Sequence, residues 1–113
     1  MEVLTPLEEE RRRHFHDLAD WWYEATDAMS SLDDKANHDA YRRIIAMGDA
    51  AVPYILEDLR DRGGHWFRAL RTITGASPVP ADMAGSVRLA KEAWLRWGRE
   101  NGLIPASADE PQH

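Results

Sequence analysis

The sequence predicts an all-α protein of about five helices. Between Leu7 and Trp97, apolar residues recur at intervals of three and four, which is the spacing that gives a helix one apolar face. Glycines or prolines interrupt this pattern at Met47-Gly48, at Gly63-Gly64 and in the segment ASPVPA at residues 76–81. We therefore expect short helices packed in series, with a long helix before them and another helix after them.

Composition limits the class of protein. The 113 residues suit one domain with one core, which we place at residues 1–105, followed by a flexible tail at residues 106–113. The chain contains no Cys, which excludes disulfides and thiolate chemistry. No apolar run approaches the ~20 residues of a membrane span, and the opening MEVLTPLEEERRR lacks the apolar region of a secretory signal. The expected location is cytoplasmic, without a membrane partner.

The first helix has a clear start signal. Thr5 as N-cap, Pro6 at the first helical position and Glu8 three residues after Thr5 match a capping box. We expect this helix to run to about Ser30, where Ser30-Ser31 and Asp33-Asp34 indicate a turn or loop. Its expected apolar stripe, with one basic exception, consists of Leu7, Arg11, Phe15, Leu18, Trp22, Ala25, Met29 and Leu32.

Three short helices are expected between residues 41 and 75. In the middle one, Asp49 can cap free amides, and Pro53 lies in the opening turn, where its missing N–H costs little. The apolar stripe of this helix is Val52, Ile55, Leu56 and Leu59, and its polar side is Glu57, Asp58, Arg60 and Asp61. The helix before it offers to the core Tyr41, Ile44 and Ile45, and the helix after it offers Trp66, Phe67, Leu70 and Ile73. Gly48 and Gly75 suit left-handed helix ends.

The last helix follows a rigid connector that contains Pro78 and Pro80. We expect it to begin near Asp82 or, because Gly85 weakens the first turn, at Ser86. Its apolar stripe is Met83, Val87, Ala90, Trp94 and Trp97. The dipeptide Asn101-Gly102 supplies a left-handed stop.

One part of the sequence resembles a known family. The segment IAMGDAAVP at residues 45–53, followed by Ile55-Leu56 and Leu59, is similar to the two-helix unit of HEAT-like repeats. The segment ALRTITG at residues 69–75, with two later Trp residues, resembles the ending of many bacterial HEAT-like proteins. The resemblance covers about residues 38–102 and implies a HEAT-like helical-hairpin core. Because solenoids stack about three or more units and we find one clear unit and a decayed second, the first and last helices are expected to cap the core.

The sequence contains no motif for catalysis. Its Ser and Thr residues lie in no G-x-S-x-G setting, and it has neither a P-loop nor a dinucleotide-binding glycine pattern. His14 and His16 diverge by about 200° around the first helix, so they cannot share one metal ion. Neither HExxH nor Cys accompanies them. We expect no enzymatic activity, no cofactor and no metal.

Two sets of side chains are candidates for binding a partner. Trp22 lies on the apolar stripe, so at least one of its neighbours Trp21 and Tyr23 should be partly exposed. These neighbours either border the core or anchor a partner, since exposed Trp and Tyr are typical hot-spot residues. The second set is basic and consists of Arg42, Arg43, Arg60, Arg62, Arg68 and Arg71. These arginines either pair with Glu57, Asp58, Asp61 and the acidic first helix, or they form one basic surface.

Charge favours a protein partner over nucleic acid. The formal net charge is −6; residues 1–40 carry 11 acidic and 4 basic side chains, whereas residues 41–75 carry 4 acidic and 6 basic ones. An acidic chain disfavours non-specific binding to nucleic acid, which depends on neutralising phosphates. HEAT-like families are mostly interaction scaffolds without shared catalytic residues, so the resemblance also implies protein binding.

We therefore expect a non-enzymatic protein–protein interaction module, such as an antitoxin-like or regulatory protein. The expected binding residues are Trp21, Tyr23, Arg42, Arg43, Arg68 and Arg71. The alternative is a nucleic-acid-associated module that uses the arginine-rich face of residues 42–71. The sequence makes no prediction of oligomeric state.

Overall fold

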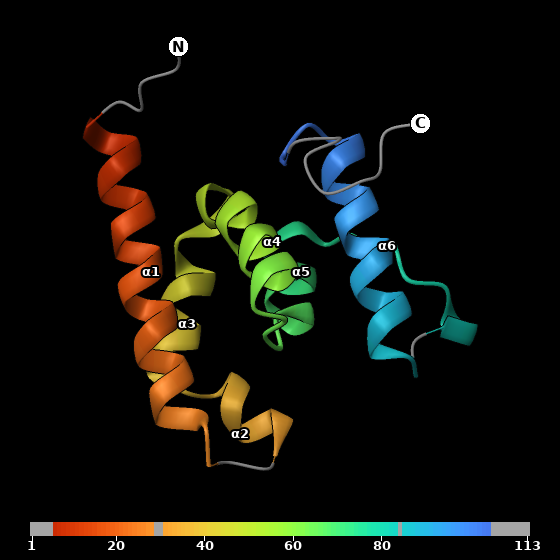
Figure 1. Cartoon of the computed structure of the whole chain (residues 1–113), viewed down its shortest axis with the longest axis horizontal. Helices are drawn as coiled ribbons and strands as arrows, with labels where there is room; N and C mark the ends of the chain where they lie inside the picture. Colours follow the sequence, from red (N-terminus) through yellow and green to blue (C-terminus); the bar gives the residue numbers. More distant parts are fainter. Residues whose placement is uncertain (1–5, 29–30, 84, 105–113) are drawn as a thin grey trace.

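The computed structural model describes residues 6–28, 31–83 and 85–104. Every regular element in these ranges is helical, which confirms the predicted all-α class (Figure 1). The elements are α1 (Pro6–Thr26), α2 (Leu32–Ala36), α3 (Asp39–Ala46), the 3₁₀ helix η1 (Gly48–Ala51), α4 (Val52–Asp61), α5 (Phe67–Thr74), the 3₁₀ helix η2 (Ala81–Met83) and α6 (Val87–Glu100). None of the described helices has the length and apolar content that crossing a membrane requires. The predicted N-cap Thr5 and the predicted tail at residues 106–113 lie outside the described residues.

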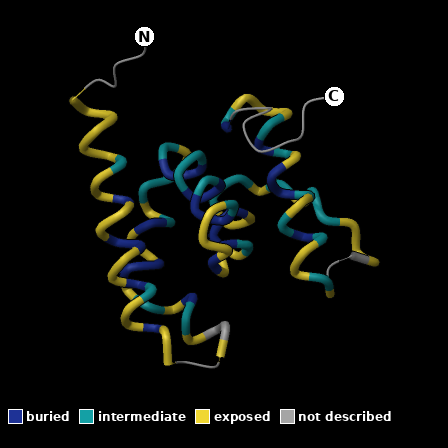
Figure 2. The backbone as a smooth tube through the Cα atoms, in the orientation of Figure 1, coloured by how far each residue is buried: buried dark blue, intermediate teal, exposed yellow. Residues whose placement is uncertain are grey.

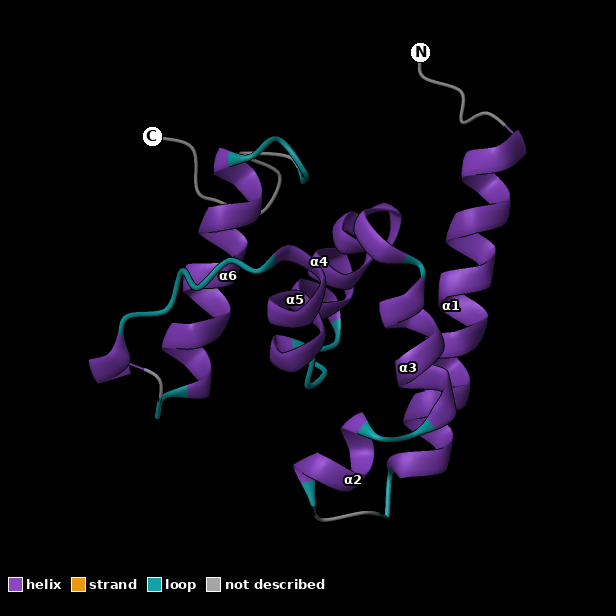
Figure 3. Ribbon diagram, turned by 180° about the vertical axis from the view of Figure 1, so that it is seen from behind, coloured by secondary structure: helices purple, strands orange, loops and turns teal. Residues whose placement is uncertain are grey.

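The longest two helices stand on opposite sides of the molecule, and α3, α4 and α5 lie between them (Figures 1 and 3). α1 packs against α3 and η1, and α6 packs against α4. Buried residues follow the inner faces of these helices, while the outward faces of α1 and α6 are exposed (Figure 2). The predicted arrangement, in which the first and last helices flank shorter central ones, is therefore present.

Aromatic rings from α1, α3 and the residue before α5 form the centre of the core. The ring of Trp66 stacks on that of Tyr41, with centroids 5.4 Å apart and planes 9° apart. Trp22 lies against both rings, and Phe15 lies against Trp66. None of these four side chains is more than 1% exposed. Because each such ring buries about 150–250 Å² of surface, this cluster supplies a large part of the hydrophobic stabilisation.

The polar atoms of these buried rings have hydrogen-bond partners. The indole nitrogen Nε1 of Trp22 donates to the carbonyl oxygen of Lys35 at 2.7 Å. The hydroxyl of Tyr41 donates to the carbonyl oxygen of His65 and accepts from the amide of Ala69, both at 3.0 Å. Burial raises the pKa of Tyr41 to about 12. These bonds attach α2 to α1 and the start of α5 to α3.

Helix α6 approaches α4 closely because Gly98 has no side chain. A Cβ atom at this position would lie 2.6 Å from Cδ1 of Leu56. The helix begins after Ser86, whose hydroxyl oxygen accepts a hydrogen bond from the amide of Leu89 at 3.2 Å. Of the two predicted starts, the later one is therefore correct.

Some sequence-based expectations about α1 were wrong. The helix ends at Thr26, not near Ser30, and the short helix α2 occupies part of the predicted loop. Leu7, predicted to face the core, is 53% exposed, and Ala25 is also exposed. Met29, another predicted core residue, lies outside the described residues.

Two expectations about α4 were also wrong, whereas the predicted helix ends were correct. Asp49 belongs to η1, and neither η1 nor α4 has a side-chain cap. Asp58, predicted on the polar side, is only 5% exposed. Left-handed backbone occurs at each predicted stop, namely Gly48, Gly75 and Gly102.

Candidate functional site

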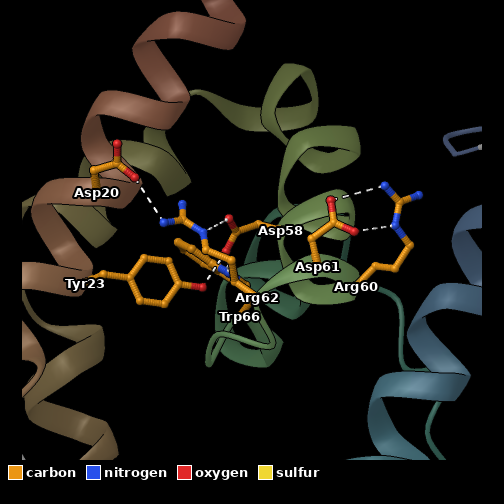
Figure 4. Close-up of polar contacts among 7 residues, drawn as sticks. All are labelled: Asp20, Tyr23, Asp58, Arg60, Asp61, Arg62 and Trp66. Atoms are coloured by element: carbon orange, nitrogen blue, oxygen red, sulfur yellow. Dashed lines mark hydrogen bonds and ion pairs between the residues drawn. The ribbon is translucent and has the colours of Figure 1, made fainter.

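Asp58 is the only buried charged residue in the described part of the chain. Its Oδ2 atom accepts hydrogen bonds from the hydroxyl of Tyr23 at 2.5 Å and from Nε1 of Trp66 at 2.7 Å (Figure 4). Its Oδ1 atom accepts from Nε of Arg62 at 2.7 Å. The same guanidinium donates through Nη1 to Asp20 at 3.0 Å. These five side chains therefore join α1, α4 and the start of α5.

The centre of the network, at Asp58 and Trp66, is buried, whereas Asp20 and Arg62 lie at its exposed edge. Burial, followed by the hydrogen bond to Asp58, raises the pKa of Tyr23 well above its usual value, so its hydroxyl remains a donor at neutral pH. The guanidinium of Arg62 lies over the Tyr23 ring, 4.2 Å from its centroid. A Cβ atom on Gly64 would collide with the Tyr23 hydroxyl and lie 2.7 Å from Nε1 of Trp66. Because these groups bond to one another and leave no room at Gly64, we assign this network a structural role.

The carboxylates of α4 account for two of the six predicted basic residues. Asp61 pairs with Arg60, with Oδ1 and Nε 2.8 Å apart, and Asp58 pairs with Arg62 as described above. Arg60 and Arg62 thus follow the first alternative, in which the arginines pair with acidic neighbours. The third carboxylate, Glu57, pairs with Arg12 of α1 at 3.0 Å.

Trp21, His38 and Arg43 form a second group where α1 meets α3. Trp21 is 42% exposed, which confirms that at least one neighbour of Trp22 is partly exposed. Its ring meets His38 edge-on, with centroids 5.1 Å apart, and the guanidinium of Arg43 lies 5.8 Å from its centroid. His38 also caps α3, because its Nδ1 accepts from the amide of Ala40 at 3.0 Å. Arg42 lies 3.9 Å from Asp39 on the same helix.

Two of the predicted arginines line a surface hollow of about 200 Å³ beside α5, which we call the cationic hollow. Its lining residues are Ala36, Tyr41, His65, Phe67, Arg68 and Arg71. Among the described residues, none that lines this hollow is acidic. Lys35 adds to its positive surroundings: burial and then the charge of Lys35 lower the pKa of His65. A negatively charged group would therefore be attracted to this recess.

A second hollow, of about 160 Å³, adjoins the first, and we call it the apolar hollow. Its lining residues are Phe67, Arg71, Ser77, Pro78, Val79, Ala90 and Trp94. Phe67 and Arg71 line both hollows and are four residues apart on α5, so they form one ridge between them. Two further hollows include acidic lining residues, Glu10 in one and Asp49 in the other. Among these four hollows, only the two beside α5 have basic and no acidic residues in the described part of their lining.

The predicted binding residues therefore fall into separate groups. Arg68 and Arg71 lie together in the cationic hollow, whereas Trp21 and Arg43 contact each other at the α1–α3 seam. Tyr23 is half-buried and uses its hydroxyl inside the molecule. The sequence pattern did not indicate the other lining residues of the cationic hollow as binding residues. Phe67 shares α5 with the two arginines, whereas Ala36, Tyr41 and His65 come from α2, α3 and the bend before α5.

No group of three or more His, Asp or Glu side chains that could hold a metal ion occurs in the described residues. His14 and His16, the residues considered for metal binding, are both exposed on α1. Comparisons with protein-family models, with curated proteins and with solved structures return no match to this chain.

Proposed function

We propose that this protein is a non-catalytic protein-binding module that holds an acidic segment of another protein in the cationic hollow. The observation that carries the proposal is the lining of that hollow, which contains two arginines and, among the described residues, no carboxylate. Arg71 forms no ion pair within the described part of the chain, although α4 carries three carboxylates that pair with other arginines. Its charge is therefore available to a partner.

The recess would strengthen such an interaction relative to an open surface. Guanidinium groups bind carboxylates through two parallel hydrogen bonds, which fixes orientation as well as adding energy. Tyr41 and Phe67 line the same hollow, so a carboxylate bound in it would be partly shielded from water and salt. A partner with one or two Asp or Glu side chains in a short segment fits this arrangement.

The alternative function, binding to nucleic acid, receives less support. Affinity for nucleic acid rises with the number of phosphates that are neutralised, and the cationic hollow offers two arginines. The net charge of −6 repels a long polyanion, while a short acidic segment contacts only the local surface. An antitoxin-like or regulatory protein built on a HEAT-like scaffold would act by occupying another protein in this way.

Affinity capture from a native lysate tests the proposal. The wild-type chain is compared with a double variant, Arg68→Glu and Arg71→Glu, and with the control Arg96→Glu, which changes an exposed arginine of α6 outside both hollows. We expect one protein partner to be captured by the wild type and by the control and to be lost from the double variant. Equal capture by all three chains, or capture that disappears on nuclease treatment, would contradict the proposal.

A further inference from the structure

The apolar hollow lies directly beside the cationic hollow, and its lining differs in kind. Trp94 and Ala90 are buried and form its floor, while Phe67, Pro78 and Val79 are half-buried along its walls. Apart from Arg71 on the shared ridge, none of the described lining residues is charged. Five of the seven described lining residues are apolar, so an apolar side chain that enters this recess removes apolar surface from water and gains affinity.

The size of the apolar hollow suits one large side chain. Its volume is about 160 Å³, and a cavity of about 150 Å³ in another protein accommodates a benzene ring. One wall is the connector at residues 76–80, where two prolines restrict the backbone. A wall that is already ordered loses little entropy when a ligand binds.

The ridge between the hollows is narrow enough for one short peptide to cross. It consists of a single row of side chains, Phe67 and Arg71, on a helix whose full diameter is about 10–12 Å. In an extended peptide, side chains two or three positions apart are separated by roughly 7–10 Å. Two side chains of one segment at this spacing can therefore reach the two hollows, one in each.

From this juxtaposition we infer that the bound segment carries an Asp or Glu within three residues of an aromatic or large aliphatic side chain. The carboxylate occupies the cationic hollow, and the apolar side chain occupies the apolar hollow. The inference rests on the proposed function and adds a second recognition element to it. Charge complementarity selects the acidic residue, and volume and lining select the apolar one.

Selection from a random peptide library tests the inference directly. The full chain is the bait, and the affinity of the enriched peptides is then measured by titration. We expect the enriched sequences to combine an acidic residue with Phe, Tyr, Trp or Leu at a spacing of up to about three residues. Replacing that apolar residue by Ala should weaken binding by roughly 10-fold to 100-fold, the equivalent of burying one large apolar side chain.

Variants of the chain separate the two hollows. Val79→Glu places a carboxylate in the apolar hollow, and Val87→Glu makes the same change at a valine that is 62% exposed and lines neither hollow. Ser77→Glu gives a second blocking variant at an exposed position, in case Val79→Glu fails to fold. We expect Val79→Glu and Ser77→Glu to lose at least tenfold in peptide affinity, and Val87→Glu to retain it.

The outcomes distinguish this inference from the function on which it rests. Enrichment for acidic residues alone, with binding lost in Arg68→Glu but retained in Ser77→Glu, would overturn the inference and leave the proposed function standing. Peptides without acidic residues, or binding unaffected by Arg68→Glu, would overturn both. If a labelled oligonucleotide binds in a salt-sensitive manner and competes with the peptides, both proposals are overturned in favour of nucleic acid. If the chain self-associates and Arg71→Glu abolishes the association, both are overturned in favour of a second copy of this chain.

Discussion

The hydroxyl of Tyr23 on α1 donates a 2.5 Å hydrogen bond to Oδ2 of Asp58 on α4, two residues that lie 35 positions apart in the sequence. The indole of Trp66 donates to the same oxygen at 2.7 Å. One buried carboxylate thus organises three donors from separate parts of the chain, including Arg62 at Oδ1. Stability is expected to depend strongly on this carboxylate.

Asp58→Ala should be among the most damaging substitutions in the protein. It leaves the Trp66 indole and the Tyr23 hydroxyl without their acceptor, and each buried polar group left without a partner costs about 1–3 kcal/mol. Arg62 keeps its ion pair with Asp20, so the two lost acceptor contacts dominate the expected loss. Urea unfolding followed by circular dichroism gives the free energy of unfolding. Asp61→Ala is the matched control on the same helix, because its pair with Arg60 is exposed and contributes about 1 kcal/mol or less. Equal losses in the two variants would contradict this account.

Tyr23→Phe should destabilise the fold by about 1–3 kcal/mol, because it removes one donor from a buried carboxylate while keeping the ring. Tyr54→Phe serves as its control, since the Tyr54 hydroxyl makes only a 3.5 Å bond to the carbonyl of Glu8 on the exposed side. We expect the control to change the free energy of unfolding by less than about 0.5 kcal/mol. Equal urea midpoints for the two variants would show that the Tyr23 hydroxyl does not stabilise the fold.

Gly64→Ala should destabilise the protein by roughly 1–3 kcal/mol through overpacking, because the new Cβ meets the Tyr23 hydroxyl and the Trp66 indole. Removal of that hydroxyl should relieve part of the clash. A double-mutant cycle with Tyr23→Phe should therefore give a smaller loss than the two single losses combined. Gly85→Ala is the control, since a Cβ there meets open space. A purely additive cycle would show that the Tyr23 hydroxyl is not the obstacle.

Stability should fall at high pH because burial raises the pKa of two tyrosines, Tyr23 and Tyr41. The contribution of Tyr41 can be isolated. Burial raises its pKa in the folded chain to about 12, above the value of about 10 for an unfolded chain. Below pH ~10 the hydroxyl is protonated in both states, so this group gives no pH dependence. Above that pH the unfolded chain loses its proton first, and the free energy of unfolding decreases by on the order of 1 kcal/mol per pH unit until the folded pKa is passed.

Comparison with Tyr41→Phe isolates this effect. The variant lacks the titrating hydroxyl, so its free energy of unfolding should decline less steeply than that of the wild type between about pH 10 and pH 12. Urea unfolding at a series of pH values measures both slopes, and the ultraviolet absorbance of tyrosinate follows ionisation directly. Parallel slopes in the two proteins would rule out Tyr41 as a cause.

The helices could be predicted from the sequence because their signals are local. Spacing by threes and fours located every long helix, and glycines marked the ends of α3, α5 and α6. The exposure of Leu7 could not be predicted in this way. Its position on the stripe is correct, but whether a stripe is covered depends on which elements lie opposite.

The burial of Asp58 could not be predicted either, for a related reason. Its position flanks the apolar stripe of α4, where a carboxylate normally faces solvent. Its donors include Tyr23, 35 residues before it, and Trp66, eight residues after it, so no local pattern contains the set. The candidate site shows the same limit: Arg68 and Arg71 were predicted from charge, whereas the wall contributed by Tyr41 and Ala36 depends on tertiary packing.

The stack of Tyr41 on Trp66 has a practical consequence. Two chromophores held 5.4 Å apart in a fixed, nearly parallel geometry should give a near-ultraviolet dichroic signal that vanishes when side-chain packing is lost, even if helices persist. The molecule thereby carries a label-free optical reporter of the junction between α3 and α5, next to the wall where an incoming peptide would dock.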